Sequence, residues 1–431
     1  MILSEKFHSK KFAIYGLGVT GKSVVRFFQK SKFDKFFTWD DDYKKRPTKN
    51  TAQKFKKILN EVDYIILSPG IDTNKTIFKN NLKKNCHKII SDIDLFYMCK
   101  SNIKTIVVTG TNGKSTTCKL LEHLLKYNNI KSYLGGNIGK PILSLTEKNS
   151  LFAIIEVSSF QLANSKFIKP NFAVILNITK DHLDWHKNMR NYENSKFKIF
   201  SLQDRKDFAF LSEKRLKKIF LKRKYLSKLK TVSLERYLKI KKRIKNSYLL
   251  SKFNEQNMCF AYEISKILKI KDKSFVKTVN SFKGLEHRHE IFFYKKNLKI
   301  INDSKATSFE ATKLALKSNN NISWIVGGLP KLGDVIKVKP LKNKIIKAYI
   351  IGNNRSFFKK QLKNILPFEM SKNMQTAIRS IFSDIKKTSK NNHTILLSPA
   401  SASYDQYSNF MERGAEFKRI AKKYANKFLS R

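Results

Sequence analysis

Short apolar runs alternate with amphipathic stretches along the whole chain. Residues 106–108 are a β-branched run of the kind that forms a buried strand, and Leu120, Leu121, Leu124 and Leu125 then recur at helical spacing. Further strands are expected at 11–15, 36–39, 64–67, 151–155, 173–177, 300–301, 324–326, 349–351 and 394–397. Strands that alternate with helices are typical of α/β folds with a mainly parallel sheet.

Glycine turns and the order of these elements divide the 431 residues into three parts. Residues 1–92 and 285–431 each carry strands that run into glycine or small polar turns, and each is predicted to be a Rossmann-like domain. Residues 93–284 are predicted to form a central P-loop-type ATPase domain with a mainly parallel sheet. A chain of this length is ample for several buried cores.

The central part opens with residues typical of a phosphate-binding loop. Gly110 and Gly113 flank a tight polar turn, and Lys114 and Ser115 follow at the start of the helix. Loop N–H groups and the helix N-terminus favour an anion, the lysine reaches the outer phosphates, and the hydroxyl can bind Mg²⁺. The generic pattern has another glycine where Val108 stands, so this loop is shorter. A chance turn before Lys-Ser is the alternative, and the flanking strand and helix disfavour it.

Polar side chains also follow two further strands of the central part. Glu156 stands at the end of one apolar run, and His182 comes shortly after another. Because the carboxyl ends of parallel strands meet at one sheet edge, we expect both residues to lie near Ser115. Oxygen ligands suit Mg²⁺ bound together with nucleotide phosphates. A lone histidine is more often structural, but the expected proximity of Glu156 and Ser115 favours a magnesium site.

The N-terminal part carries a glycine turn of the pattern GxGxxG at residues 16–21, with Asp40 at the end of the next strand. Alone, these residues are typical of an NAD site with the acid on a ribose, but the same turn also serves other nucleotides or helix packing. Ser68 and Gly70 form another turn, at the end of the third strand.

The formal charge of +55 is extreme for a chain of this size. It could reflect a polyanionic partner such as nucleic acid, or a general enrichment of lysine on the protein surface that serves no specific partner. The lysines are spread along the chain, which favours the second interpretation. Residues 213–245 hold 15 Lys or Arg against two Glu, yet few aromatic residues interleave with them. We therefore expect a solvated basic region and no nucleic-acid partner.

The chain shows no sign of export or membrane insertion. No apolar run approaches the ~18 residues of a membrane span, and the first residues lack an apolar signal core. The four cysteines stand without metal-binding spacing, at Cys86, Cys99, Cys118 and Cys259. We expect a cytoplasmic protein with reduced thiols and no stable membrane association.

Taken together, the motifs resemble those of the Mur ligase family of ATP-dependent amide ligases. The matching segments, in order, are TGTNGKST (109–116), EVSSFQL (156–162), NITKDHLD (177–184), GLEHR (284–288), NDSKAT (302–307) and LSPASAS (397–403). Residues 405–414, DQYSNFMERG, are similar to the D-glutamate-adding branch in particular. The resemblance covers essentially the whole chain.

This resemblance implies ligation of D-glutamate to UDP-N-acetylmuramoyl-L-alanine, a cytoplasmic step of peptidoglycan synthesis. ATP would phosphorylate the substrate carboxylate, and the D-glutamate amine would then displace phosphate. A sibling ligase that adds another amino acid and a folate polyglutamate synthase are alternatives. The residues of the acceptor pocket distinguish between these ligases. An NAD-dependent dehydrogenase would leave Glu156 and the phosphate loop unexplained. The family resemblance also implies ATP, Mg²⁺ (two ions) and a monomeric enzyme.

The resemblance further assigns roles residue by residue. ATP would be held by Gly110, Thr111, Asn112, Gly113, Lys114, Ser115, Thr116, Asn254, Arg288 and Asp303. The uridine diphosphate would be framed by Gly18, Val19, Thr20, Asp40, Ser68 and Gly70, and D-glutamate by Lys305, Thr307, Lys331, Ser403 and Phe410. Lys114, Asn137, Glu156, His182 and Lys196 would lie at the reacting centre. The Mg²⁺ ligands would be Ser115, Glu156, His182 and Lys196, the lysine as its carbamate.

One position departs from the family pattern at the expected uridine diphosphate site. After Asp40 the family has a small hydroxyl residue, whereas this chain has Asp41. A second acid near a diphosphate is unfavourable unless its carboxylate is turned away or paired.

Overall fold

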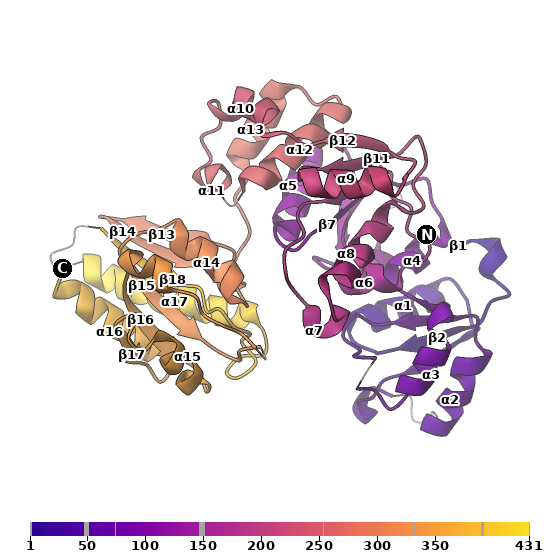
Figure 1. Ribbon diagram of the computed structural model, residues 1–431, viewed down its shortest axis with the longest axis horizontal. Helices are drawn as coiled ribbons and strands as arrows, with labels where there is room; N and C mark the ends of the chain where they lie inside the picture. The colour runs from indigo at the N-terminus through magenta and orange to yellow at the C-terminus, as the bar shows by residue number, and fades with distance from the viewer. Residues whose placement is uncertain are drawn as a thin grey trace. The chain divides into compact units, whose positions relative to one another are not determined.

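The computed structural model describes residues 2–46, 51–73, 75–145, 151–252, 254–331, 333–388 and 392–430. The chain divides into two compact units, the first comprising 1–250 and 254–282 and the second 251–253 and 283–431. The first unit holds two parallel sheets with a small two-stranded sheet, and the second holds one mainly parallel sheet (Figure 1). The predicted three-domain α/β architecture is confirmed, while the exact domain limits at 92 and 284 stay predictions.

The N-terminal domain is a four-stranded parallel sheet of order β3-β2-β4-β5. Its strands are β2 (Phe12–Tyr15), β3 (Phe36–Trp39), β4 (Tyr64–Leu67) and β5 (Ile89–Ile90), and its helices are α1 (Val19–Lys30), α2 (Ala52–Glu61), α3 (Lys79–Lys84) and α4 (Asp92–Tyr97). A short strand β1 (Ile2–Leu3) pairs antiparallel with β6 (Cys99–Lys100). This pairing ties the beginning of the chain to the segment that leads into the central domain.

The central domain is a six-stranded parallel sheet of order β12-β11-β10-β7-β9-β8. Its strands are β7 (Lys104–Thr109), β8 (Ser132–Gly136), β9 (Phe152–Glu156), β10 (Phe172–Ile175), β11 (Phe208–Leu211) and β12 (Lys228–Thr231). Its helices are α5 (Lys114–Tyr127), α6 (Ser159–Asn164), α7 (Leu183–His186), α8 (Met189–Phe197), α9 (Lys214–Lys222), α10 (Leu234–Lys241), α11 (Ser247–Leu250), α12 (Glu255–Ile267) and α13 (Asp272–Ser281). Strands β9, β7 and β10 are neighbours, so their carboxyl ends share one edge.

The second unit is a six-stranded sheet of order β13-β14-β18-β15-β16-β17, in which only β13 runs antiparallel to its neighbour. Its strands are β13 (Glu290–Lys295), β14 (Leu298–Asn302), β15 (Ile322–Gly327), β16 (Ile345–Ile351), β17 (Phe368–Met370) and β18 (His393–Leu397). The helices α14 (Phe309–Lys317) and α15 (Arg355–Leu362) share one hydrophobic core, and α16 (Met374–Lys386) and α17 (Phe410–Leu429) share another. The sheet is therefore covered on both faces, as a parallel sheet requires.

A buried carboxylate joins the two domains of the first unit. Asp94, at the start of α4, is fully buried. Its Oδ1 accepts hydrogen bonds from Ser165 Oγ (2.7 Å) and from the backbone N–H groups of Lys166 (2.9 Å) and Phe167 (2.7 Å) of the central domain. Its Oδ2 accepts from the backbone and hydroxyl of Ser91. A buried charge is tolerated here because donors surround it.

We expect Asp94→Ala to lower the free energy of unfolding of the first unit by about 2–4 kcal/mol, because it leaves several buried donors without an acceptor. Equilibrium unfolding in urea, followed by circular dichroism, measures this loss. Asp34→Ala is the matched control, since Asp34 is an exposed acid of the same domain. Equal unfolding midpoints for the two variants would contradict the assigned role of Asp94.

Candidate active site

Strand β7 carries the phosphate-binding loop to the carboxyl edge of the central sheet. Gly113 has a φ of 85°, and a Cβ there would lie 2.3 Å from Asn257 Oδ1, so only glycine fits. Lys114 begins α5, and its Nζ donates to the carbonyl oxygens of Gly110 (2.8 Å) and Thr111 (2.9 Å). The lysine therefore lies folded over the loop that would hold the phosphates. Ser115 and Thr116 are buried in the first turn of the helix.

The neighbouring strand β10 braces this loop. Asn177 follows that strand, and its backbone carbonyl accepts from the N–H of Thr111 (3.0 Å). Its side-chain Oδ1 accepts from the N–H of Asn112 (2.9 Å). Asn177 was not among the predicted site residues. Its position shortly after a strand of the central sheet is the sequence signal that could have identified it.

Glu156 is the last residue of β9 and is 2% exposed. Its Oε1 accepts a hydrogen bond from Asn137 Nδ2 (3.0 Å), and its carbonyl accepts from the backbone N–H of Asn137 (2.8 Å). Within the described residues, its buried Oε2 has no hydrogen-bond partner. Burying a carboxylate oxygen without a donor is unfavourable, so this atom is suited to a cation. Asn137 follows β8, which includes Gly136 as its final residue.

Lys196 lies on α8 with 1% of its surface exposed. Its Nζ donates to the carbonyl of Gly110 (3.0 Å) and to Thr109 Oγ1 (3.5 Å), and it stands 4.6 Å from the ring centre of Tyr192. Burial, with the charge of nearby Lys114, holds the pKa of Lys196 well below its usual range. The structure therefore places a buried amine directly beneath the phosphate loop.

His182 precedes α7 in a left-handed conformation, with a φ of 52°. Its Nε2 lies 3.3 Å from Asp181 Oδ2, and its ring centre is 4.9 Å from that of Phe160. His186, one turn further, hydrogen-bonds Ser159 Oγ (2.9 Å), and burial lowers the pKa of His186 to about 4. His186 is therefore buried, whereas His182 is partly exposed, with 35% of its side chain accessible.

Of the predicted magnesium ligands, Ser115 follows the loop after β7, Glu156 ends β9, and His182 lies in the segment after β10. Lys196 contacts the β7 loop from α8. Within the residues that the structure describes, no three His, Cys, Asp or Glu side chains gather into a metal-binding group. A site here would combine Glu156 and His182 with the hydroxyl of Ser115 and a modified Lys196. The buried Glu156 Oε2, which has no hydrogen-bond partner among the described residues, fits such a site.

The glycine turn of the N-terminal domain connects β2 to α1. Gly16 has a φ of 95°, and its carbonyl accepts from Ser68 Oγ (2.7 Å). Asp40 is buried, and its carboxylate accepts from the backbone N–H groups of Leu17 (2.6 Å) and Asp42 (2.9 Å). The acid therefore shapes the turn itself. A role for it toward uridine stays a prediction, as it does for Gly18, Val19, Thr20 and Gly70.

The unexpected acid at position 41 is paired, although not with a lysine. Asp41 accepts hydrogen bonds from Tyr15 Oη (2.7 Å) and Trp39 Nε1 (3.0 Å). Arg46 stacks on the Trp39 ring at 4.0 Å and donates to the backbone carbonyls of Asp40 (2.6 Å) and Asp41 (2.7 Å). These contacts orient the carboxylate of the exposed Asp41 toward Tyr15 and Trp39, and they bring a guanidinium to the same strand end.

Asn254 immediately precedes α12 and is 5% exposed. Its Oδ1 accepts from Asn257 Nδ2 (3.0 Å), and its own Nδ2 donates to the carbonyl of Tyr248 (2.9 Å). The side chains of Asn254 and Asn257 therefore lie together, and Asn257 also packs against the phosphate loop at Gly113. Contact of Asn254 with adenine stays a prediction.

In the second unit, Asp303 follows β14. Its carboxylate accepts from the backbone N–H of His289 (3.0 Å) and from Ser398 Oγ (2.8 Å). Burial raises the pKa of Asp303 to about 7, and the charge of Arg288 opposes that rise. The predicted roles of these two residues toward ATP remain untested by this arrangement.

The residues predicted to hold D-glutamate lie at the carboxyl edge of the sheet in the second unit. Lys305 Nζ stands 3.9 Å from the ring centre of Phe410, the first residue of α17. Thr307 donates its backbone N–H to the carbonyl of Lys305 (2.9 Å). Lys331 follows β15, and the buried Ser403 follows β18. The structure thus brings Lys305 and Phe410 into contact and places the others on adjacent strand ends.

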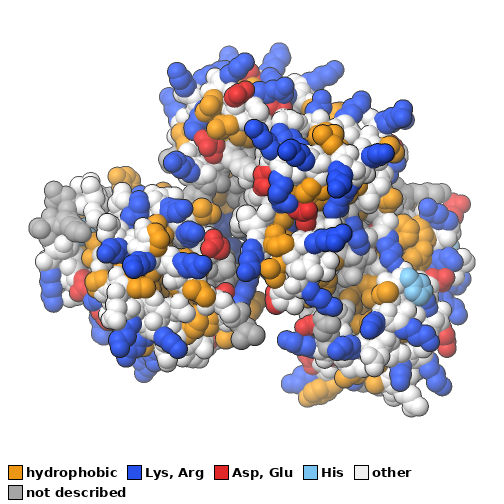
Figure 2. Space-filling view, in the orientation of Figure 1, with side chains coloured by type: hydrophobic (Ala, Val, Ile, Leu, Met, Phe, Trp, Pro, Cys, Tyr) orange, Lys and Arg blue, Asp and Glu red, His pale blue; other side chains and the backbone are white. Residues whose placement is uncertain are grey.

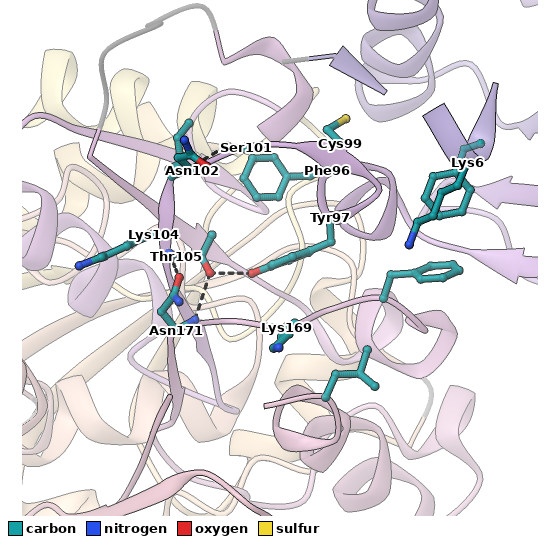
Figure 3. Close-up of a pocket in the computed structure, with 14 residues that line it drawn as sticks. Lys6, Phe96, Tyr97, Cys99, Ser101, Asn102, Lys104, Thr105, Lys169 and Asn171 are labelled. Carbon is teal, nitrogen blue, oxygen red and sulfur yellow. Dashed lines mark hydrogen bonds between the residues drawn. The ribbon is translucent and has the colours of Figure 1, made fainter. Parts of the chain in front are cut away.

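A cavity of about 550 Å³ lies elsewhere in the first unit (Figure 3). Lys104 and Thr105, which line it, stand at the amino end of β7, opposite the phosphate loop. Tyr97 Oη donates to Thr105 Oγ1 (2.9 Å), and Asn171 Oδ1 accepts from the Thr105 backbone (2.9 Å). This cavity therefore does not belong to the candidate active site.

Charged side chains do not concentrate on one domain. Figure 2 shows Lys and Arg distributed over both units on the visible face. The basic region at 213–245 forms α9, β12 and α10 of the central domain. None of the helices in the described parts of the chain combines the length and the apolarity needed to cross a membrane.

Comparison with known proteins agrees with this architecture. Residues 108–277 match the model of the Mur ligase middle domain, and residues 10–90 match that of the Mur ligase MurD-like N-terminal domain. Among solved structures, the fold is similar to MurF ligase from Thermotoga maritima in complex with ADP, at 14% identity and a TM-score of 0.58 over 97% of this chain and 100% of that one. UDP-N-acetylmuramate-alanine ligase MurC from the same organism gives a TM-score of 0.58 at 14% identity, over 96% and 99% of the two chains.

Curated relatives align over nearly the full length. The chain is 34% identical to the UDP-N-acetylmuramoylalanine–D-glutamate ligase of Rickettsia prowazekii, over 97% of this chain and 99% of that protein. It is 34% identical to the enzyme of the same name from Fusobacterium nucleatum, over 96% and 99% of the two chains. The family-model matches, the shared fold and this full-length similarity establish that the chain belongs to the Mur ligase family, alongside its UDP-N-acetylmuramoylalanine–D-glutamate ligases.

Proposed function

We propose that this protein ligates D-glutamate to UDP-N-acetylmuramoyl-L-alanine, with conversion of ATP to ADP and phosphate. The observation that carries this proposal is the gathering of Lys114, Lys196 and the unpartnered Glu156 oxygen at one sheet edge. The relatives that align with the whole chain carry the name of this activity. A carboxylate is a poor electrophile, so a site that activates it with phosphate needs cationic groups of this kind.

The proposed reaction has two chemical steps. A carboxylate oxygen of the alanyl group attacks the γ-phosphorus of ATP, and ADP leaves. The D-glutamate nitrogen then attacks the acyl carbon of the resulting acyl phosphate, loses a proton, and expels phosphate through a tetrahedral intermediate. Lys114 would neutralise charge on the phosphate oxygens during both steps, and Asn137 would orient the reacting carboxyl group. The loop N–H groups would hold the nucleotide in line.

Mg²⁺ is assigned to the Glu156 edge of the site. Ser115, Glu156, His182 and a carbamate on Lys196 would hold the two ions, whose charge would lower the repulsion between the phosphates and the substrate carboxylate. The carbamate forms when the neutral amine nitrogen attacks the carbon of dissolved CO₂ and loses one proton. This change turns a buried cation into an oxygen-bearing anion, which a metal ligand requires.

The substrate ends are assigned to different parts of the chain. The turns at 16–21 and at Ser68 and Gly70 would bind the uridine diphosphate, with Asp40 shaping the first turn. Asn254, Arg288 and Asp303 would contact ATP. Lys305, Thr307, Lys331, Ser403 and Phe410 would bind D-glutamate, since two lysines and hydroxyl groups suit a small dicarboxylate. We expect the enzyme to act as a monomer in the cytoplasm, where ATP and the nucleotide sugar are available.

Phosphate release tests the proposal directly. The protein is incubated with ATP, Mg²⁺ and UDP-N-acetylmuramoyl-L-alanine, with and without D-glutamate. We expect phosphate release that depends on D-glutamate and is not supported by L-glutamate, glycine or L-lysine. Release that is independent of D-glutamate, or that depends on another amino acid, would reject the assignment of the acceptor.

We expect Asn137→Ala to raise the Mg²⁺ concentration needed for half-maximal activity about 10- to 100-fold, because Asn137 orients the Glu156 carboxylate through Oε1. A Mg²⁺ titration at saturating substrates measures this shift. Asn128→Ala is the control, since Asn128 lies at the far end of α5. An unchanged Mg²⁺ requirement with a raised KM for the nucleotide sugar would mean that Asn137 contacts only the substrate.

A further inference from the structure

One buried guanidinium lies at the centre of the second unit's candidate site. Arg413, on the first turn of α17, is 1% exposed. Its Nε donates to Ser304 Oγ (3.0 Å), and its Nη2 donates to the carbonyls of Ser304 (2.9 Å) and Ser401 (3.0 Å). Its Nη1 approaches the carbonyls of Ala402 (3.3 Å) and Gly327 (3.5 Å). Every one of these acceptors is a neutral oxygen.

The acceptors lie at the bases of three different loops: Ser304 follows β14, Ser401 and Ala402 follow β18, and Gly327, the last residue of β15, begins the third loop. These strands are adjacent in the sheet, in the order β14-β18-β15. The loop that contains Ser304 continues into Lys305 and Thr307, the loop after Gly327 continues to Lys331, and the loop with Ser401 continues to Ser403. Each loop held by Arg413 therefore carries at least one residue assigned to D-glutamate. The helix that carries Arg413 begins with the remaining one, Phe410.

The backbone around the guanidinium is closely packed, and further hydrogen bonds join the loops to one another. Leu329 and Ala402 exchange backbone hydrogen bonds of 2.9 and 3.1 Å, which join the β15 and β18 loops. Gly328 has a φ of 135°, and a Cβ there would lie 2.2 Å from the carbonyl oxygen of Ala402 and 3.1 Å from Arg413 Nη1. Ser304 Oγ, which accepts from Arg413, also donates to the carbonyl of Phe410 (2.8 Å).

We propose that Arg413 is a positioning residue that fixes the geometry of the acceptor amino-acid site by binding all three loops at once. This inference rests on the proposed function, because it concerns the residues assigned there to D-glutamate. Arginine suits the task because its planar group presents five donors in fixed directions, whereas lysine has three donors on one atom. Without the guanidinium, the loops lose the donor that they share. The relative positions of Lys305, Lys331 and Ser403 are then no longer fixed by it.

The test is steady-state kinetics of Arg413→Lys and Arg413→Ala with the full-length protein, varying each substrate in turn. We expect the KM for D-glutamate to rise about 10- to 100-fold, since small displacements of positioning groups have effects of this size. The KM values for ATP and the nucleotide sugar should change by less than about two-fold, because a defect in positioning acts on one substrate. Guanidinium chloride at low millimolar concentration should partly restore Arg413→Ala, and urea should not.

Arg419→Ala is the matched control, since Arg419 is exposed on the same helix. If Arg413→Ala does not fold, Ser304→Ala and Arg413→Lys decide, and both should shift the D-glutamate KM in the same direction. An unchanged D-glutamate KM in any folded variant, or equal rises in all three KM values, would overturn the inference. If the wild-type protein shows no D-glutamate-dependent phosphate release, the proposed function is wrong and the inference falls with it.

Discussion

Replacing Lys114 by alanine is expected to reduce kcat/KM for the D-glutamate-dependent reaction by at least about 10³-fold, the scale of removing a charge that stabilises a phosphoryl-transfer transition state. Lys114 Nζ already lies over the phosphate loop, bound to the carbonyls of Gly110 and Thr111. Exchanging these carbonyls for phosphate oxygens requires only a rotation of the side chain. The measurement is phosphate release at saturating Mg²⁺ with each substrate varied.

The control for this prediction lies on the same helix. Lys119 is one turn further along α5 and forms an ion pair with Glu122 (3.0 Å). Lys119→Ala should leave kcat/KM within about two-fold of the wild-type value, because the amine of Lys119 is paired with Glu122 and not with the phosphate loop. Thermal unfolding of both variants separates loss of catalysis from loss of structure. Full activity of Lys114→Ala would show that the loop does not hold the transferred phosphate.

Most of the fold could be predicted from the sequence because its strands are short apolar runs that end in glycine or polar turns. The run at 106–108, the helix that follows Lys114 and the strand ending at Glu156 are all specified locally by hydrophobic pattern. Strand order is not specified locally. The position of β7 between β10 and β9, which brings Asn177 and Glu156 to the same loop, arises from the packing of segments distant in sequence.

The candidate site likewise combines features that local sequence specifies with features that only tertiary packing specifies. The glycine loop and the acid at the end of a strand follow from local sequence, whereas the pairing of Asp41 with Tyr15 and Trp39 depends on side chains from two strands. Arg413 is the clearest case. Its sequence position indicates only a helical arginine, and its role appears when three loops converge on it. Buried polar networks are set by tertiary contacts, so one-dimensional patterns do not reveal them.

Lys196→Ala is expected to reduce kcat about 10³-fold, because it removes the proposed anionic ligand of the second Mg²⁺. The position of the amine supports this expectation. Its Nζ donates to the carbonyl of Gly110 at 3.0 Å, and its side chain is almost completely buried. A carboxyl group added to that nitrogen would stand beside the phosphate loop. The measurement is kcat with all substrates and Mg²⁺ saturating, and Lys198→Ala is the control, since Lys198 Nζ binds the carbonyl of Ala163 instead.

Chemical rescue separates a carbamate from a simple lysine. If Lys196 acts as its carbamate, acetate or propionate supplied with bicarbonate-free buffer should partly restore Lys196→Ala, because a short carboxylate can occupy the vacated space and supply the missing anion. If the residue acts as a cation, short alkylamines should restore activity and carboxylates should not. Wild-type activity should also fall on exhaustive removal of CO₂ and return when bicarbonate is added. Full activity of Lys196→Ala, or rescue by amines alone, would reject the carbamate and leave Ser115, Glu156 and His182 as the proposed metal ligands.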